Sequence, residues 1–190
     1  MSTSKRNTIY HILHPYKPVF SPTSKILILG TIPSLATIKN GFYFMHNQSK
    51  FWLVMEKIFH MEFQYKITEG QRAADERKNF LLKHDIALWD VLKSCDIKGY
   101  GERYVKDPTP NNFSDIFKQA NIAQIFCIGE FAYKFWNSLC KDIYNKSAVC
   151  LPAPSAGSKI YWDIDKLVEE YKKAILPFLG DKNNLQEKSK

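Results

Sequence analysis

The chain of 190 residues lacks any long apolar run. No stretch approaches the roughly 18 consecutive apolar residues that a membrane-spanning helix needs. The polar residues 1–6 also lack the apolar core of a secretory signal peptide. We therefore expect no membrane partner and a cytoplasmic, intracellular location.

Paired metal-binding cysteines are absent too. The four cysteines, Cys95, Cys127, Cys140 and Cys150, form no C-x-x-C pair, and no histidine pattern typical of zinc lies near them. Cys127 lies in an apolar run, where a thiol behaves as a small hydrophobic group. We expect ordinary reduced cysteines and no metal site.

Glycine-rich phosphate loops are missing as well. Neither G-x-G-x-x-G nor G-x-x-x-x-G-K-[ST] occurs in the chain. This absence argues against a dinucleotide cofactor and against ATP, and we expect no cofactor.

The composition is that of one globular domain. Hydrophobic residues make up 45% and charged residues 24% of the chain, both close to globular averages. Lys and Arg number 27 against 19 Asp and Glu, a formal net charge of +8. A basic balance weakly favours an anionic partner. The aromatic content of 14% serves core packing for the most part, although aromatic rings also stack on bases.

Apolar runs alternate with amphipathic stretches along the chain. This alternation predicts an α/β layered domain around a mostly parallel four-stranded sheet. The expected strands are 25–29, 86–91, 122–128 and 147–151, of which 86–91 is a short strand or else a strand-to-helix junction. The expected helices are 50–59, 71–84, 113–120, 130–140 and 163–176, the last ended by Pro177. Residues 1–24, 31–40 and 96–112 are expected to be irregular or loops, and 180–190 a polar tail.

Two loops stand at the carboxyl ends of expected strands, where parallel sheets bind their ligands. One is Gly30 to Ser34 and the other is Leu151 to Ser158. With two segments between them, they look like four family motifs. These are G-[ST]-x-P-[SG] at 30–34, G-[FY]-Y-[FY]-x-H-P-x-N-[RK]-F-W at 41–52 (with two departures), L-W-D-V-L at 88–92 with P-N-[DN]-F at 110–113, and L-P-x-[PT]-S-x-x-[NS] at 151–158. In this order and spacing the motifs resemble the uracil-DNA glycosylase superfamily, most of all its DNA-deoxyinosine (hypoxanthine-DNA) glycosylase branch.

The resemblance implies a three-layer α/β/α sandwich. It also implies a single glycosylase-like domain over 25–179, with residues 1–24 packed on it and 180–190 as a tail. The implied reaction is hydrolysis of the N-glycosidic bond of a deaminated base in DNA, hypoxanthine first, with uracil and xanthine as further candidates. Such an enzyme flips the nucleotide, activates a water and leaves an abasic site. No lysine stands out as a Schiff-base nucleophile, so we expect a monofunctional enzyme. We expect a monomer, because the search for damage needs one DNA footprint and no symmetric site.

Residue roles follow from the same resemblance. The expected substrate-binding residues are Gly30, Thr31, Ile32, Pro33, Ser34, Phe44, His46 and Asn111. Phe44 would stack on the flipped base, or else pack in the core. His46 would bind base or phosphate, or else be structural. Asn111 would contact the base or water, or else cap a loop.

The catalytic position departs from the family pattern. Ser49 stands where the branch has the asparagine used in catalysis, and Asn47 stands at the proline position. A serine hydroxyl can hydrogen-bond a water but lacks the amide's fixed donor and acceptor. We therefore name Ser49 and Asn47 as the two candidate catalytic residues.

The closing loop is the expected DNA contact, and taken alone it would be an ordinary turn. Its residues are Pro154, Ser155, Ala156, Gly157, Ser158 and Lys159. A small, flexible loop can enter the minor groove and contact phosphates through its backbone N–H groups. Trp89 and Asp90 are expected to pack and cap under the pocket rather than to form part of it.

Two other readings stay open. A DNA-binding member of the same superfamily with impaired catalysis is favoured by Ser49. An unrelated α/β enzyme of nucleosides or phosphorylated metabolites is disfavoured by the lack of a phosphate-binding glycine loop. Salt-dependent DNA binding separates the first two readings from the third, and base release separates an enzyme from a binding protein.

Overall fold

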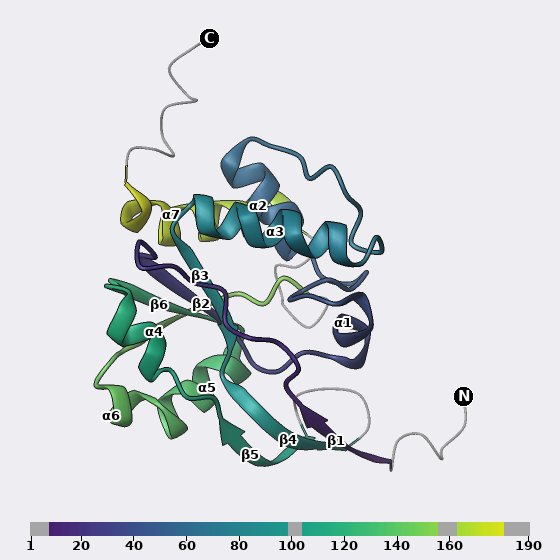
Figure 1. The fold of residues 1–190 in the computed structure, drawn as a ribbon, viewed down its shortest axis with the longest axis vertical. Helices are drawn as coiled ribbons and strands as arrows, with labels where there is room; N and C mark the ends of the chain where they lie inside the picture. Colours follow the sequence, from purple (N-terminus) through teal and green to yellow (C-terminus); the bar gives the residue numbers. More distant parts are fainter. Residues whose placement is uncertain (1–7, 99–103, 156–162, 181–190) are drawn as a thin grey trace.

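The computed structural model describes residues 8–98, 104–155 and 163–180. Within these ranges the strands form two sheets (Figure 1). The larger sheet is parallel throughout and has four strands, in the order β3 (Ile86–Asp90), β2 (Ile26–Gly30), β6 (Gln124–Ile128) and β7 (Ala148–Leu151). The parallel four-stranded sheet predicted from the sequence is confirmed.

Strand β2 lies in the middle of this sheet and is apolar on both faces. Ile26 and Ile28 belong to one hydrophobic cluster, whereas Leu27 and Leu29 belong to the other. Alternate residues of a strand point to opposite faces, so a run without polar residues must be covered on both sides. This explains why the continuous apolar run was readable as a buried strand.

Helices cover both faces of the larger sheet, as Figure 1 shows. One cluster contains residues of α2 (Phe51–Phe59), α3 (Gln71–Lys83) and α7 (Ile164–Leu179). The other contains residues of α4 (Ser114–Gln119) and α5 (Glu130–Leu139), next to the short α6 (Lys141–Tyr144). Two helical layers around one sheet make the expected three-layer α/β/α sandwich.

The second sheet was not expected. Strand β4 (Leu92–Lys98) pairs antiparallel with both β1 (Ile9–Leu13) and β5 (Val105–Pro110). The predictions of an irregular 1–24 and of a loop over 96–112 are therefore wrong in part. These strands carry polar residues, and β5 contains Pro108 and Pro110, which a sheet tolerates on an edge strand.

Two helix boundaries also differ from expectation. The loop predicted over 31–40 contains α1 (Leu35–Asn40), which begins where the Ser34 side chain accepts a hydrogen bond from the backbone N–H of Thr37. Helix α7 continues through Pro177 to Leu179 instead of ending near residue 176. Packing of its buried residues outweighs the local preference of proline to end a helix.

The two sheets meet at the carboxyl ends of β2 and β3. Beyond Asp90 the chain still follows β2, because the N–H of Val91 donates to the carbonyl of Gly30 at 2.8 Å and that of Leu92 to Thr31 at 2.9 Å. It then continues as β4 into the second sheet. This junction fixes the loop after β2, on which the candidate site is built.

None of the described helices is long and apolar enough to cross a membrane. In the same ranges, no group of three or more His, Cys, Asp or Glu residues is arranged to hold a metal ion. Cys95, Cys127 and Cys140 are buried and Cys150 is exposed, all four without a disulfide.

Candidate active-site pocket

A cavity of about 120 Å³ opens where β2, β3, β6 and β7 end. Its size compares with an engineered cavity of about 150 Å³ that binds benzene, so it suits one small planar ring system rather than a large cofactor. The lining residues are Gly30, Thr31, Ile32, Pro33, Ser34, Thr37, Phe44, His46, Ser49, Asp90, Ile128, Ala153, Pro154 and Ser155.

Most of the residues expected at the site line this cavity. They are the five residues Gly30 to Ser34, together with Phe44, His46, Ser49, Pro154 and Ser155. Asn47 and Asn111 are not among the lining residues. Ala156, Gly157, Ser158 and Lys159, expected to contact DNA, lie outside the described residues.

Asn111 supports the chain next to the cavity. Its side-chain amide donates to the carbonyl of Asp90 at 3.0 Å and to that of Leu92 at 3.1 Å. Both donors of the amide are thus engaged by the backbone at the junction of the two sheets. This geometry matches the loop-capping alternative for Asn111.

The two candidate catalytic residues lie in different surroundings. Ser49 lines the cavity, whereas Asn47 is exposed. The Oγ of Ser49 accepts the N–H of Phe51 at 3.3 Å, at the start of α2. A hydroxyl that accepts from the backbone can still donate its own hydrogen, so Ser49 keeps one donor for a water.

Phe44 contributes an aromatic wall in an unusual backbone conformation. Its φ of 55° is left-handed, which is rare for a bulky residue and often found at functional sites. The ring stacks on Phe51, with centroids 4.2 Å apart and planes 22° apart. Phe44 is thus held against the first residue of α2 at the edge of the cavity.

His46 lies partly buried on the same loop. Burial lowers the pKa of its imidazole below the usual value, because desolvation disfavours the charged form. A neutral imidazole offers one donor and one acceptor. His46 therefore suits hydrogen bonding to a neutral base better than pairing with a phosphate.

The loop after β7 is tied down over the cavity. The hydroxyl of Tyr171, on α7, donates to the carbonyl of Pro152 at 2.7 Å, and the N–H of Lys50 donates to Pro154 at 2.7 Å. The second bond joins the loop to the segment that carries Ser49. The loop after β7 and the segment that carries Ser49 thus meet at one wall of the cavity.

Thr31 presents an unsatisfied polar group at the cavity. Its Oγ1 is buried and has no hydrogen-bond partner, although the residue lines the cavity. Buried polar atoms are rarely left without a partner, and exceptions need an explanation. A ligand in the cavity would supply one.

Asp90, which the sequence analysis left out of the site, lines the cavity. Only 4% of the residue is exposed, and its Oδ1 is the atom closest to Gly30 on the side where a Cβ would stand. The Oδ2 lies 2.9 Å from Nε2 of His14, whose side chain is 1% exposed. Asp90 ends β3 beside the end of β2, so the strand-end argument already applied to Gly30 would have found it.

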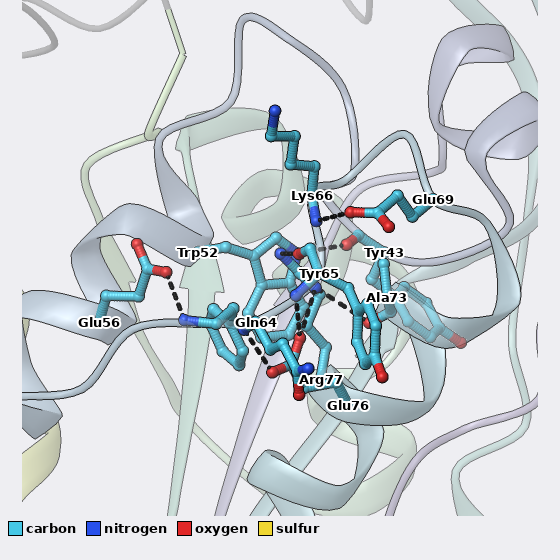
Figure 2. Close-up of polar contacts among 11 residues, drawn as sticks. Tyr43, Trp52, Glu56, Gln64, Tyr65, Lys66, Glu69, Ala73, Glu76 and Arg77 are labelled. Carbon is cyan, nitrogen blue, oxygen red and sulfur yellow. Dashed lines mark hydrogen bonds and ion pairs between the residues drawn. The ribbon is translucent and has the colours of Figure 1, made fainter.

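A wider groove adjoins the cavity and shares Ser49 with it. Arg77 of α3 lies along this groove, with the guanidinium 4.4 Å from the ring centroid of Phe63. It donates to the carbonyls of Tyr65 and Ala73 (Figure 2). Its Nε is buried without a partner. Arg77 therefore secures the segment 61–69 beside α2.

Comparison with known proteins gives a consistent result. The sequence model of the Uracil DNA glycosylase superfamily matches residues 17–180. Two curated proteins named hypoxanthine DNA glycosylase are each 29% identical to this chain: one from Methanosarcina barkeri over 99 residues, or 52% of the chain, and one from Methanosarcina acetivorans over 114 residues, or 59%. The matches span 59% and 67% of the length of those relatives.

A solved structure shares the fold. The solution NMR structure of a protein from M. acetivorans, described as a candidate uracil DNA glycosylase, superposes with a TM-score of 0.67 at 20% identity. The similarity covers 88% of this chain and 96% of that chain.

Proposed function

We propose that this chain, which belongs to the uracil DNA glycosylase superfamily, is a DNA glycosylase that removes a deaminated base by hydrolysing its N-glycosidic bond. Hypoxanthine is the first candidate base, because both curated relatives are named for it. Uracil and xanthine are further candidates. The enzyme is expected to act as a monomer on a flipped nucleotide.

The observation that carries this proposal is the buried carboxylate of Asp90 in a cavity sized for one planar ring system. Hypoxanthine, xanthine and uracil all carry a ring N–H beside a carbonyl, and a carboxylate accepts such a hydrogen. Adenine and cytosine carry a lone pair at that position, which a carboxylate repels. Asp90 would therefore favour hypoxanthine over adenine and uracil over cytosine, whereas guanine shares the ring N–H of xanthine and is not distinguished by this contact.

The other lining groups have complementary roles in this proposal. The unpartnered hydroxyl of Thr31 and the imidazole of His46 would hydrogen-bond the remaining edges of the base. Phe44 would stack on its face. Ser49 would orient the attacking water, because it lines the cavity whereas Asn47 does not.

The absence of a lysine from the described lining residues favours a monofunctional reaction. A lysine nucleophile would form a Schiff base with the sugar and lead to strand cleavage. Attack by water instead releases the base and leaves an abasic site. The strand breaks only when alkali is added.

The test is a single-turnover assay on labelled duplexes that carry one hypoxanthine, uracil or xanthine. We expect scission at hypoxanthine only after hot alkali. Ser49→Ala should slow base release by roughly 10- to 100-fold, the effect of one strong hydrogen bond. Asn47→Ala, two residues away and exposed, is the matched control and should leave the rate unchanged.

Melting temperatures of both variants show whether a slower rate comes from lost stability, because Ser49 also accepts the Phe51 N–H at the start of α2. Equal rates for wild type and Ser49→Ala would remove serine from the catalytic role. A larger loss in Asn47→Ala would assign the water to Asn47 instead.

A second function is favoured by Ser49 itself, which replaces the asparagine of the related branch. In this alternative the chain binds DNA without releasing a base. Binding that weakens with salt, together with no scission on any of the three duplexes, would establish it in place of the enzyme.

A further inference from the structure

His14 lies ahead of the residues that match the family model, which begin at residue 17. It directly follows β1, and its backbone N–H donates to the carbonyl of Lys93 on β4 at 2.8 Å. Although the segment runs along the edge of the molecule, the side chain of His14 is only 1% exposed. The ring therefore points inward from the second sheet toward the cavity wall.

The hydrogen bonds of the ring fix its role. Nδ1 accepts the backbone N–H of Tyr16 at 3.2 Å, so the proton of a neutral ring resides on Nε2. Nε2 then donates to Oδ2 of Asp90 at 2.9 Å. Each nitrogen has one partner, and the ring cannot flip without losing both bonds.

Aromatic neighbours hold the ring on its other sides. Tyr16, Tyr43 and Trp89 place their ring centroids 5.8, 5.8 and 6.3 Å from that of His14. Burial and the charge of Asp90 raise the pKa of Tyr16 to about 12 and raise that of Tyr43 as well. Both phenols thus stay neutral.

With Oδ2 engaged by His14, the orientation of the carboxylate is set. Its Oδ1 then stands against Gly30, which lines the cavity together with Asp90. A carboxylate free to rotate would present either oxygen and would spend part of its time away from the ligand. A hydrogen-bonding group that is already held in the required orientation binds its ligand more strongly than one that must first be ordered.

We propose that His14 is a positioning residue for base selection, holding Asp90 so that Oδ1 accepts the ring N–H of a deaminated base. This inference rests on the proposed function, and it adds a residue from outside the matched domain to the machinery of the cavity. His14 touches no substrate and acts only through Asp90.

The test measures binding rather than chemistry. Duplexes carry one 2′-fluoro-deoxyinosine or one 2′-fluoro-deoxyadenosine, because the fluorine makes the glycosidic bond resist cleavage. The discrimination is the ratio of the two dissociation constants. For wild type we expect a preference for inosine of roughly 10- to 100-fold, the effect of a hydrogen bond to a charged group.

Variants separate positioning from packing. His14→Leu removes the donor and should abolish most of the discrimination, whereas His14→Gln keeps an N–H donor at a similar reach and should restore it. In an Asp90→Asn background, His14→Leu should cause no further loss, because the two residues act as one unit. A merely structural histidine would add its effect to that of Asp90→Asn.

His11→Leu is the matched control. His11 lies on the neighbouring strand β1 and makes the same kind of pair, with Nδ1 2.7 Å from Oδ1 of Asp96, but it is exposed and does not line the cavity. Its variant should retain the full preference for inosine.

The outcomes for this inference and for the proposed function are distinct. Unchanged discrimination in His14→Leu, additive losses in the double variant, or an equal loss in His11→Leu would overturn the positioning role even if base release is observed. A His14-dependent preference for inosine without base release would uphold the positioning role and reject the glycosylase. Absence of any preference in wild type overturns the inference.

Discussion

Gly30 ends β2 directly beneath the Asp90 carboxylate. A methyl group built on Gly30 would overlap with Oδ1 of Asp90 and come within 3.3 Å of Cζ of Phe44. Gly30→Ala should therefore displace the carboxylate, lower the free energy of unfolding by about 1–3 kcal/mol and abolish most base release. Urea unfolding and the single-turnover assay measure the two effects separately.

Gly41→Ala provides the control for stability. Gly41 has a φ of 87° and open space where a Cβ would stand, so alanine there suffers backbone strain of about 1–2 kcal/mol without a clash. Activity should survive in Gly41→Ala. If both variants lose activity in proportion to stability, Gly30 has no specific relation to Asp90.

His46 predicts a pH effect on stability. Burial lowers the pKa of His46 in the folded protein. Below about pH 6.5, the imidazole is therefore protonated more fully in the unfolded chain than in the folded chain. The free energy of unfolding should therefore fall as the pH falls below that value. His46→Gln should show a smaller fall between pH 7.5 and 5.5 in urea titrations.

His60→Gln removes an exposed histidine at the end of α2 and serves as the comparison. If the free energies of unfolding of wild type and His46→Gln fell in parallel with pH, the prediction would be wrong, because the burial of His46 would then have no effect on stability. Carboxylates titrate in all three proteins, so only the differences between curves are informative.

At the scale of elements, α3 supports the segment 61–69 through one side chain. The two terminal nitrogens of Arg77 reach the carbonyls of Tyr65 and Ala73 at 3.0 and 3.1 Å. Lysine has a single nitrogen and cannot reproduce this fork. Arg77→Lys should lower the free energy of unfolding by about 1–3 kcal/mol and expose the segment to proteases that cut after Phe63 or Tyr65.

Arg72→Lys, an exposed change on the same helix, should leave both stability and the cleavage pattern as in wild type. If Arg77→Lys were cleaved at the wild-type rate, the hydrogen bonds of this segment to glutamate side chains would be sufficient to hold segment 61–69 in place. Those contacts are the N–H groups of Phe63, Gln64 and Tyr65, which donate to Glu56 and Glu76.

At the scale of the whole molecule, the sequence predicted the parallel sheet and its helices because each central strand is a run of apolar residues. It did not predict β1, β4 and β5. Ile9 of β1 pairs with Lys98, across a separation that local patterns do not reveal, and β5 contains Pro108 and Pro110, which are unusual in a strand. Local preference also failed at Pro177, where packing decides.

The candidate cavity also contains residues that the sequence predicted and residues that it did not. Its two loops were identifiable because they follow apolar strands, and Phe44, His46 and Ser49 because they lie in one motif. Asp90 was assigned, together with Trp89, to packing and capping under the pocket, whereas it lines the cavity. His14 carried no signal at all, since its partner is 76 residues away.

The contact between His14 and Asp90 has a consequence for how selectivity varies among relatives. Strand β1 lies at the margin of the molecule, yet the residue that follows it, His14, supplies the donor that orients a carboxylate in the cavity. Replacement of this leading segment by one without a histidine at position 14 should weaken the preference for inosine over adenine while residues 17–180, matched by the family model, stay the same. On this proposal, a substitution at the margin of the molecule can alter selectivity without any change in the loops that line the cavity.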